Sequence, residues 1–187
     1  MEGFFVYCSL INHKSIKMKY KITLFLISIL FISCNTKTVE VEINSTGGMA
    51  YQGESKGKKF SFGSDEDAKI AVDLILAFAQ KDTETMTKCM ADSVRYMPPQ
   101  GSKPIMASSE QINEIVELLH QPYDSLKRYI WNAIPLIKEG EDFTKVTVTF
   151  NEKRYYKDGK EESIGLIDRI YIKDGKIFNI NQWMSER

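Results

Sequence analysis

An aspartate interrupts an apolar run in the segment GLIDRIYIKDGKIFNINQW, residues 165–183. The neighbouring Leu166, Ile167 and Ile170 are side chains of the kind that folding normally buries. A carboxylate among them must be paired, hydrogen-bonded or used chemically, because an isolated buried charge is very costly. Asp168 is therefore the first candidate for a functional group, and its alternative is a buried aspartate that its neighbours satisfy.

The turn residues of two hairpins predict which side chains share a face with Asp168. A two-residue turn at the second KDGK motif, residues 173–176, places Asn181 opposite Asp168. The same turn at the first KDGK motif, residues 157–160, places Thr149 opposite Asp168, provided that no bulge shifts the register. The predicted face is apolar with a group of hydrogen-bonding side chains around one carboxylate, which suits a pocket.

The other face of the same strands is predicted to be nearly continuous and apolar. Val148, Phe150, Tyr171 and Phe178 lie on this face in the predicted register. A large exposed apolar surface needs a cover, and a second copy of the chain is the simplest one. The sequence therefore predicts a homodimer through these four residues.

Composition excludes several functional classes. The chain has 187 residues with a formal net charge of zero, so no basic surface points to nucleic acid. Its three cysteines form no CxxC pair, and its two histidines are far apart in sequence. These residues predict no metal site and no cofactor.

The amino terminus is predicted to be a signal peptide, residues 1–33. Four lysines between residues 14 and 21 precede the apolar run 22–33, which is shorter than the ~20 residues of a membrane-spanning helix. Residues 1–17 are either an over-extended start or a long basic region. The FISC motif that ends in Cys34 resembles the lipobox of bacterial lipoproteins. That resemblance implies lipidation of Cys34 and a membrane-anchored protein of the bacterial cell envelope, at the outer membrane or on the periplasmic face.

The rest of the chain divides into a tether and one domain. Residues 34–63 are polar and glycine-rich, and they read as a flexible tether with one short strand at most. Residues 64–187 predict three helices, 64–82, 83–90 and 108–121, and a short strand at 92–97. Four strands follow at 125–137, 143–156, 161–173 and 176–184, joined by turns, so the fold class is α+β.

Three segments of this domain, ADSVRYMPPQGSKP, SSEQINEIVELL and LIDRIYIKDGKIFNINQW, resemble the SnoaL-like, nuclear transport factor 2-like superfamily. Ketosteroid isomerase is a member of this superfamily. The resemblance implies a cystatin-like cone, in which three N-terminal helices pack on a curved antiparallel sheet and enclose a pocket. It also implies a homodimer through the back of the sheet.

The isomerase pattern matches this chain only in part. Its protonated aspartate matches Asp168, but its base falls on Pro98 and its tyrosine on Leu74, and neither residue can transfer a proton. Steroid isomerisation is therefore rejected. The resemblance also places Trp183 at the pocket, and Tyr96, two residues before Pro98 on the same strand face, should line it too. The predicted pocket residues are Asp168, Asn181, Trp183, Thr149, Tyr96 and Trp131.

Three functions remain open from the sequence. The favoured one is a lipid-anchored protein that binds a small, largely apolar molecule in the cone without catalysis. The second is a lyase, hydratase, cyclase or isomerase of the same fold that uses Asp168 as an acid or base. The third is a protein-interaction module whose cone is filled by its own side chains. Fold alone does not choose among them.

Overall fold

The computed structural model describes residues 46–99 and 103–185, which contain seven strands, three α-helices and two short 3₁₀ turns. The helices are α2 (Asp65–Gln80), α3 (Thr83–Cys89) and α4 (Ile112–His120). Cys34 and the signal segment lie outside the described residues. No helix in the described ranges combines the length and the apolar character needed to cross a bilayer.

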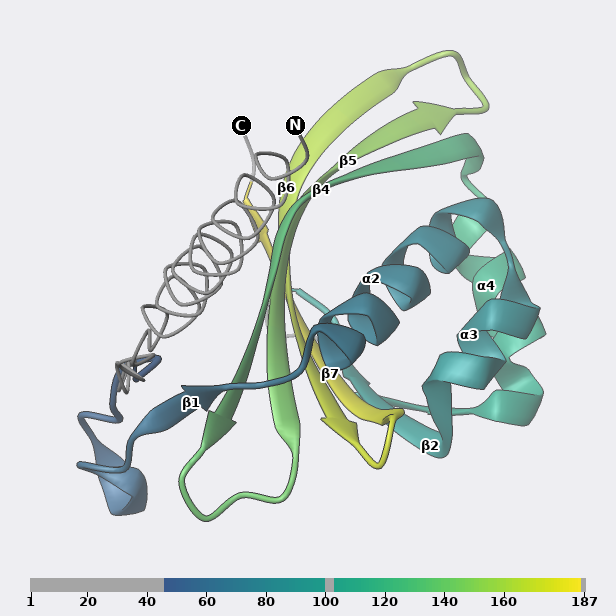
Figure 1. Cartoon of the computed structure of the whole chain (residues 1–187). Helices are drawn as coiled ribbons and strands as arrows, with labels where there is room; N and C mark the ends of the chain where they lie inside the picture. The colour runs from purple at the N-terminus through teal and green to yellow at the C-terminus, as the bar shows by residue number, and fades with distance from the viewer. Residues whose placement is uncertain (1–45, 100–102, 186–187) are drawn as a thin grey trace, which may run out of the picture. The chain divides into compact units, whose positions relative to one another are not determined.

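One seven-stranded sheet carries the domain, with the order β1-β4-β5-β6-β7-β2-β3. All neighbours are antiparallel except β2 and β7, which run parallel. Figure 1 shows α2, α3 and α4 together on one side of the curved strands, which we call the inner side. This arrangement confirms the predicted α+β fold with a curved sheet. The strands are β1 (Phe60–Phe62), β2 (Met90–Met97), β3 (Ile105–Ser108), β4 (Tyr123–Lys138), β5 (Thr144–Tyr156), β6 (Glu161–Lys173) and β7 (Lys176–Ser185).

Local sequence signals explain the ends of α2. Ser64 precedes the helix, and its Oγ accepts a hydrogen bond from Asp67 N at 3.1 Å. The acidic residues of the first turn suit the positive end of the helix dipole. Lys81 ends the helix in the left-handed conformation. Ala71, Leu74 and Ile75 are buried on the face that packs against the sheet.

Residues before α2 are joined to the edge of the sheet. Within the segment 34–63, β1 pairs with β4, and Met49 forms a bridge with Lys59. The Gly47 N–H donates to the Phe60 carbonyl at 2.7 Å. β1 therefore extends the sheet beside β4. The short strand that the sequence suggested for this segment, at VEVEI (residues 39–43), lies outside the described residues.

A β-bulge changes the predicted register of β6 and β7. The turn has the predicted two residues, with Lys173 opposite Lys176. The pairing shifts by one residue between Ile172 and Tyr171, which leaves Phe178 as the extra residue of β7. Beyond this point Asp168 faces Gln182, so the predicted pairing of Asp168 with Asn181 is wrong.

The hairpin of β5 and β6 has a three-residue loop instead of two. Tyr156 N donates to Lys160 O at 2.8 Å, and Gly159 adopts a positive φ of 84°. This loop with a left-handed glycine is a common hairpin type. It shifts the register by one residue and places Val148, not Thr149, opposite Asp168.

The two shifts exchange the faces that the sequence predicted. Val148 and Phe150 lie on the inner side with no exposed surface, so they cannot belong to a dimer face. Tyr171 and Phe178 lie on the outer side, where they form an aromatic cluster with Phe143. The predicted dimer residues thus divide between the core and the outer side of the sheet.

Candidate functional site

A cavity of about 200 Å³ lies between the helices and the inner side of the sheet. Its wall is mainly apolar and is built by α2, α3, α4, β2, β3 and the inner residues of the longer strands. Four polar side chains reach it: Tyr96, Arg128, Asp168 and Gln182. Apolar wall residues include Leu74, Ile75, Phe78, Val94, Ile112 and Val116.

Asp168 lies at the middle of β6, with Val148 and Gln182 as its cross-strand neighbours. Only 4% of the residue is exposed. Burial raises the pKa of the Asp168 carboxyl to about 6, although the Arg128 guanidinium and the hydrogen bond from Gln182 act in the opposite direction. The carboxyl group therefore titrates close to neutral pH.

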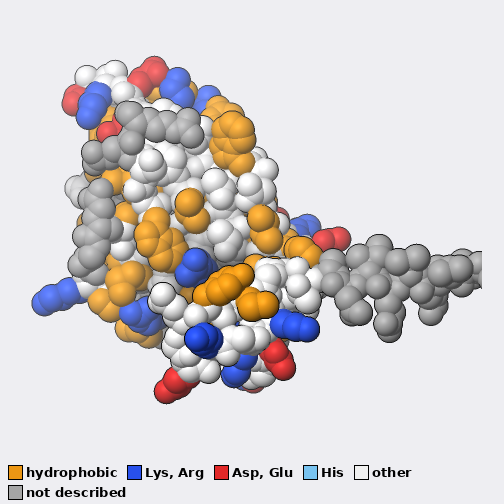
Figure 2. Space-filling model, turned by 90° about the vertical axis from the view of Figure 1, so that its left-hand side faces the viewer, with side chains coloured by type: hydrophobic (Ala, Val, Ile, Leu, Met, Phe, Trp, Pro, Cys, Tyr) orange, Lys and Arg blue, Asp and Glu red, His pale blue; other side chains and the backbone are white. Residues whose placement is uncertain are grey.

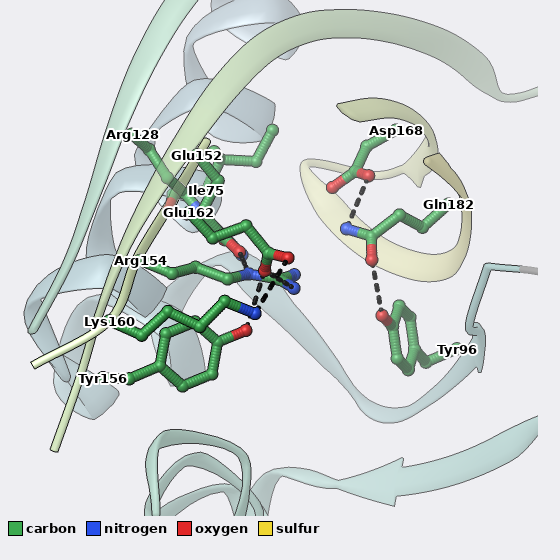
Figure 3. Close-up of polar contacts among 10 residues, drawn as sticks. All are labelled: Ile75, Tyr96, Arg128, Glu152, Arg154, Tyr156, Lys160, Glu162, Asp168 and Gln182. Atoms are coloured by element: carbon green, nitrogen blue, oxygen red, sulfur yellow. Dashed lines mark hydrogen bonds and ion pairs between the residues drawn. The ribbon is translucent and has the colours of Figure 1, made fainter. Parts of the chain in front are cut away.

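Gln182 connects Asp168 to Tyr96 (Figure 3). Its Nε2 donates to Asp168 Oδ1 at 2.9 Å, and its Oε1 accepts from Tyr96 Oη at 2.9 Å. Burial raises the pKa of Tyr96 to about 12, and the Asp168 charge adds to this effect. Tyr96 therefore keeps its proton at neutral pH, and its O–H donates a hydrogen bond to Gln182.

Sequence reasoning missed Gln182 because the bulge at Phe178 was not foreseen. The register predicted from the turn placed Asn181 on the pocket face. In the structure Asn181 faces Arg169 on the outer side, and its Nδ2 lies 3.5 Å from Tyr171 Oη. Both residues carry amides, so the residue type gave no signal to choose between them.

A second group of polar residues begins at the cavity wall with Arg128. Its Nε and Nη2 donate to Glu152 Oε2 at 2.7 and 2.6 Å, and its Nη1 donates to the Ile75 carbonyl at 3.1 Å. The guanidinium carbon lies 4.3 Å from the centre of the Phe78 ring. Arg154 Nε donates to the other Glu152 oxygen at 2.7 Å. Arg128 is thus held by several partners.

Glu152 is almost completely buried, with 2% of its surface exposed. The two arginines lower its pKa against the opposing effect of burial, so Glu152 stays ionised. One sequence signal could have found this residue. Val146, Val148, Phe150 and Glu152 follow each other at every second position, which places Glu152 on the buried face of β5.

Trp131, Thr149 and Trp183 lie on the outer side of the sheet. They surround a shallow hollow of about 310 Å³ over Gly165, where no side chain fills the space. Trp131 is 67% exposed and Trp183 is 45% exposed. Figure 2 shows hydrophobic side chains spread over this side of the molecule, with basic side chains among them. These three predicted pocket residues are therefore separated from the cavity by the sheet.

Three further residues whose types or positions bear on chemistry, Leu74, His120 and Cys89, behave as core. Leu74, at the position that the resemblance assigns to a tyrosine, contributes an apolar surface to the cavity. His120 is 3% exposed; its Nε2 donates to the Phe78 carbonyl at 2.9 Å, and burial lowers its pKa. Burial raises the pKa of the Cys89 thiol. Within residues 46–99 and 103–185, no three metal-ligating side chains gather in one place.

Similar folds occur among solved structures, although no protein-family model and no curated protein matches the chain. An LEH-like epoxide hydrolase of M. tuberculosis aligns at 11% identity with a TM-score of 0.51, covering 65% of this chain and 84% of that one. A protein of the NTF2-like family from Streptomyces avermitilis aligns at 13% identity with a TM-score of 0.53, covering 66% and 96%. AusH from Aspergillus nidulans aligns at 19% identity with a TM-score of 0.51, covering 67% and 87%. The domain has the nuclear transport factor 2-like fold.

Proposed function

We propose that this chain, with its nuclear transport factor 2-like domain, is a lipid-anchored envelope protein that binds a small, largely apolar molecule in the inner cavity. The proposal includes no bond-breaking step. The observation that carries it is the cavity itself, which combines an apolar wall with four polar side chains at defined places. Binding sites for small molecules have this composition.

The size of the cavity limits the size of the molecule. Apolar cavities of about 150 Å³ stay dry and hold benzene. A cavity of about 200 Å³ therefore suits a ring or short chain of somewhat larger size. The same open volume argues against the alternative of a cone filled by its own side chains.

The proposed anchor rests on sequence. The basic and apolar segments before Cys34 have the order of a bacterial lipoprotein signal. Lipid chains on Cys34 hold such a protein at a membrane without a spanning helix. The domain then lies at the surface of that membrane, either at the outer membrane or on the periplasmic face, where apolar molecules partition.

Catalysis by Asp168 is the second candidate, and one observation favours it. A carboxyl group with a pKa of about 6 is suited to acid or base chemistry at neutral pH. One of the similar structures is an epoxide hydrolase. Tyr96 is a poor second proton carrier, because its O–H bond is directed to Gln182 and its pKa is raised to about 12. Binding without catalysis therefore agrees better with the geometry.

We also propose that a second copy of the chain covers the outer side of the sheet. Trp131 of β4, Ile167 of β6 and Trp183 of β7 are large, exposed side chains there. The Arg169 guanidinium lies 5.0 Å from the centre of the Trp183 ring, so a nearby charge is already placed against an aromatic face. Aromatic residues and arginine are enriched in protein interfaces.

Benzene is a suitable probe of the proposed cavity site. A ligand that binds only the folded state raises Tm, by about 3–6 °C at ten times its Kd for a chain of this size. We expect benzene to raise the Tm of the full chain, measured by circular dichroism in a mild detergent. Ile180→Phe and Ala107→Met, which place larger side chains in the cavity, should lose this shift. An equal shift in all three proteins would place benzene elsewhere.

A further inference from the structure

Asp168, Gln182 and Tyr96 are joined in the cavity by two hydrogen bonds, and the direction of each bond is fixed. An ionised Asp168 can only accept, so the Gln182 amide must turn its NH₂ group toward Oδ1. The carbonyl oxygen of Gln182 then faces Tyr96, which must donate its O–H. The orientation of the amide thus follows from the charge on Asp168, and Figure 3 shows Gln182 between the two other side chains.

Asp168 and Tyr96, the two side chains at the ends of this series of hydrogen bonds, both present acceptors to the cavity. Asp168 Oδ2 makes no hydrogen bond within the described residues and is not sealed from open space. The Tyr96 O–H donates its hydrogen bond to Gln182, so the Tyr96 oxygen can only accept from a ligand. This end of the cavity therefore offers two acceptors, Asp168 Oδ2 and the Tyr96 oxygen. The second N–H of Gln182 Nε2 is the one donor of these three side chains that no hydrogen bond within the described residues uses. A hydroxyl group can donate to Asp168 Oδ2 and accept from a donor at the same time.

We propose that the molecule in the cavity is a small uncharged alcohol, with an apolar body in the apolar part of the cavity and one hydroxyl group that donates to Asp168 Oδ2. This inference rests on the proposed binding function. The cavity volume of about 200 Å³ suits roughly eight non-hydrogen atoms, since about 150 Å³ accommodates the six of benzene. The hydroxyl group supplies the donor that the two acceptors lack.

Other polar groups fit this end of the cavity less well. A ketone has no donor, so it would leave the buried Asp168 Oδ2 without a hydrogen bond. An ammonium ion carries three N–H donors for two acceptors and is costly to bury, and Arg128 already supplies a positive charge on the same wall. The Arg128 guanidinium donates its hydrogen bonds to Glu152 and to the Ile75 carbonyl.

A comparison of cyclohexanol, cyclohexanone and benzene tests the inference. The three rings are of similar size and differ in whether they carry a donor, an acceptor or neither. We expect cyclohexanol to raise the Tm of the full chain at neutral pH more than the other two at equal free concentration. A tenfold preference in Kd corresponds to a difference in Tm of about 3–6 °C near saturation.

Asp168→Asn provides the matched variant. The carbonyl group of the new asparagine can still accept from Gln182. The NH₂ group of the same asparagine then faces the cavity in place of Oδ2. This variant should reverse the preference and favour cyclohexanone, whereas Asp168→Leu should remove the preference while still binding benzene. Because the comparison is made within each protein, a general change in stability does not affect it.

The outcomes separate this inference from the proposed function. Equal shifts from all three compounds in the wild-type chain would retain the cavity site but overturn the alcohol. A larger shift from cyclohexanone would also overturn it and would indicate a donor on the cavity wall, either the second N–H of Gln182 or Arg128. No shift from any compound would overturn the binding function and the alcohol together.

Discussion

Gln182 donates a hydrogen bond to Asp168 across the hairpin of β6 and β7, with Nε2 and Oδ1 2.9 Å apart. The contact exists because Phe178 is an extra residue in β7, which moves every later residue of that strand by one position relative to β6. An amide and a carboxyl group thereby meet on the inner side of the sheet. The same shift turns Asn181 and Trp183 to the outer side.

The first prediction concerns the stability of the wild-type chain as pH changes. The pKa of Asp168 is about 6 in the folded chain and 3.8 in the reference state, so the folded state binds this proton more tightly. Stability from this group is therefore present below about pH 4 and is lost as pH rises to about 6. The difference corresponds to about 3 kcal/mol. Asp168→Asn, which mimics the neutral carboxyl, should remove this contribution to the pH dependence.

Urea denaturation followed by tryptophan fluorescence measures this effect. We expect the free energy of unfolding of Asp168→Asn to exceed that of wild type at about pH 7.5, and the two to converge at about pH 4. The comparison of the two proteins removes the contributions that other titratable groups make to the pH dependence. One of these groups is His120, whose lowered pKa decreases the free energy of unfolding in acid. A difference that stays constant with pH would contradict the raised pKa of Asp168.

The second prediction concerns the buried ion group. Glu152→Gln leaves Arg128 and Arg154 without their shared carboxylate in a site where the Arg128 and Glu152 side chains are 8% and 3% exposed. Removing one member of a buried pair costs about 3–5 kcal/mol. Glu84→Gln breaks an exposed pair with Lys88 and should cost less than about 1 kcal/mol. If urea denaturation gave the same loss in the free energy of unfolding for both variants, the buried Glu152 group would contribute no more to stability than an exposed ion pair.

The third prediction concerns the outer side of the sheet. Ile167→Glu adds a charge at the centre of the proposed contact between copies, so it should convert a dimer to a monomer. Leu118→Glu makes the same kind of change on α4, where Leu118 is 68% exposed, and should leave the dimer intact. Sedimentation equilibrium in a density-matched detergent reports the mass of the protein. A wild-type monomer at high concentration would exclude the proposed dimer.

The fourth prediction concerns the anchor. Cys34→Ser removes the sulfur that would carry the lipid, so the chain should no longer be processed as a lipoprotein. Labelling of cells with a fatty acid followed by fractionation measures both properties. We expect the wild-type chain to be labelled and membrane-bound, and Cys89→Ser, which keeps Cys34, to behave in the same way. Lipid labelling of Cys34→Ser would contradict the proposal that Cys34 carries the lipid.

Local signals predicted the elements of this fold well. Ser64 and the acidic residues after it marked the start of α2, and the two KDGK motifs marked the hairpins of β5 with β6 and β6 with β7. These features depend on residues that are close together in sequence. The helices and most strands therefore begin and end within a few residues of their predicted bounds.

The register of the strands could not be predicted in the same way. Phe178 is an extra residue in β7 where it packs with Phe143 and Tyr171 on the outer side, and this contact joins three separate segments. Asp158 and Gly159 fit both a two-residue and a three-residue loop. A shift of one residue exchanges the faces of a strand, so these two details moved Val148, Phe150 and Asn181 to the opposite side.

Native mass spectrometry of the full chain, extracted gently from cells, tests the central claim most directly. The account predicts a bound molecule of low mass that is released on activation and that Ile180→Phe, with its smaller cavity, does not carry. Its exact mass would also begin to identify the alcohol. A wild-type chain that never carries or takes up a small molecule, also after incubation with benzene and cyclohexanol, would contradict a binding function for the cavity.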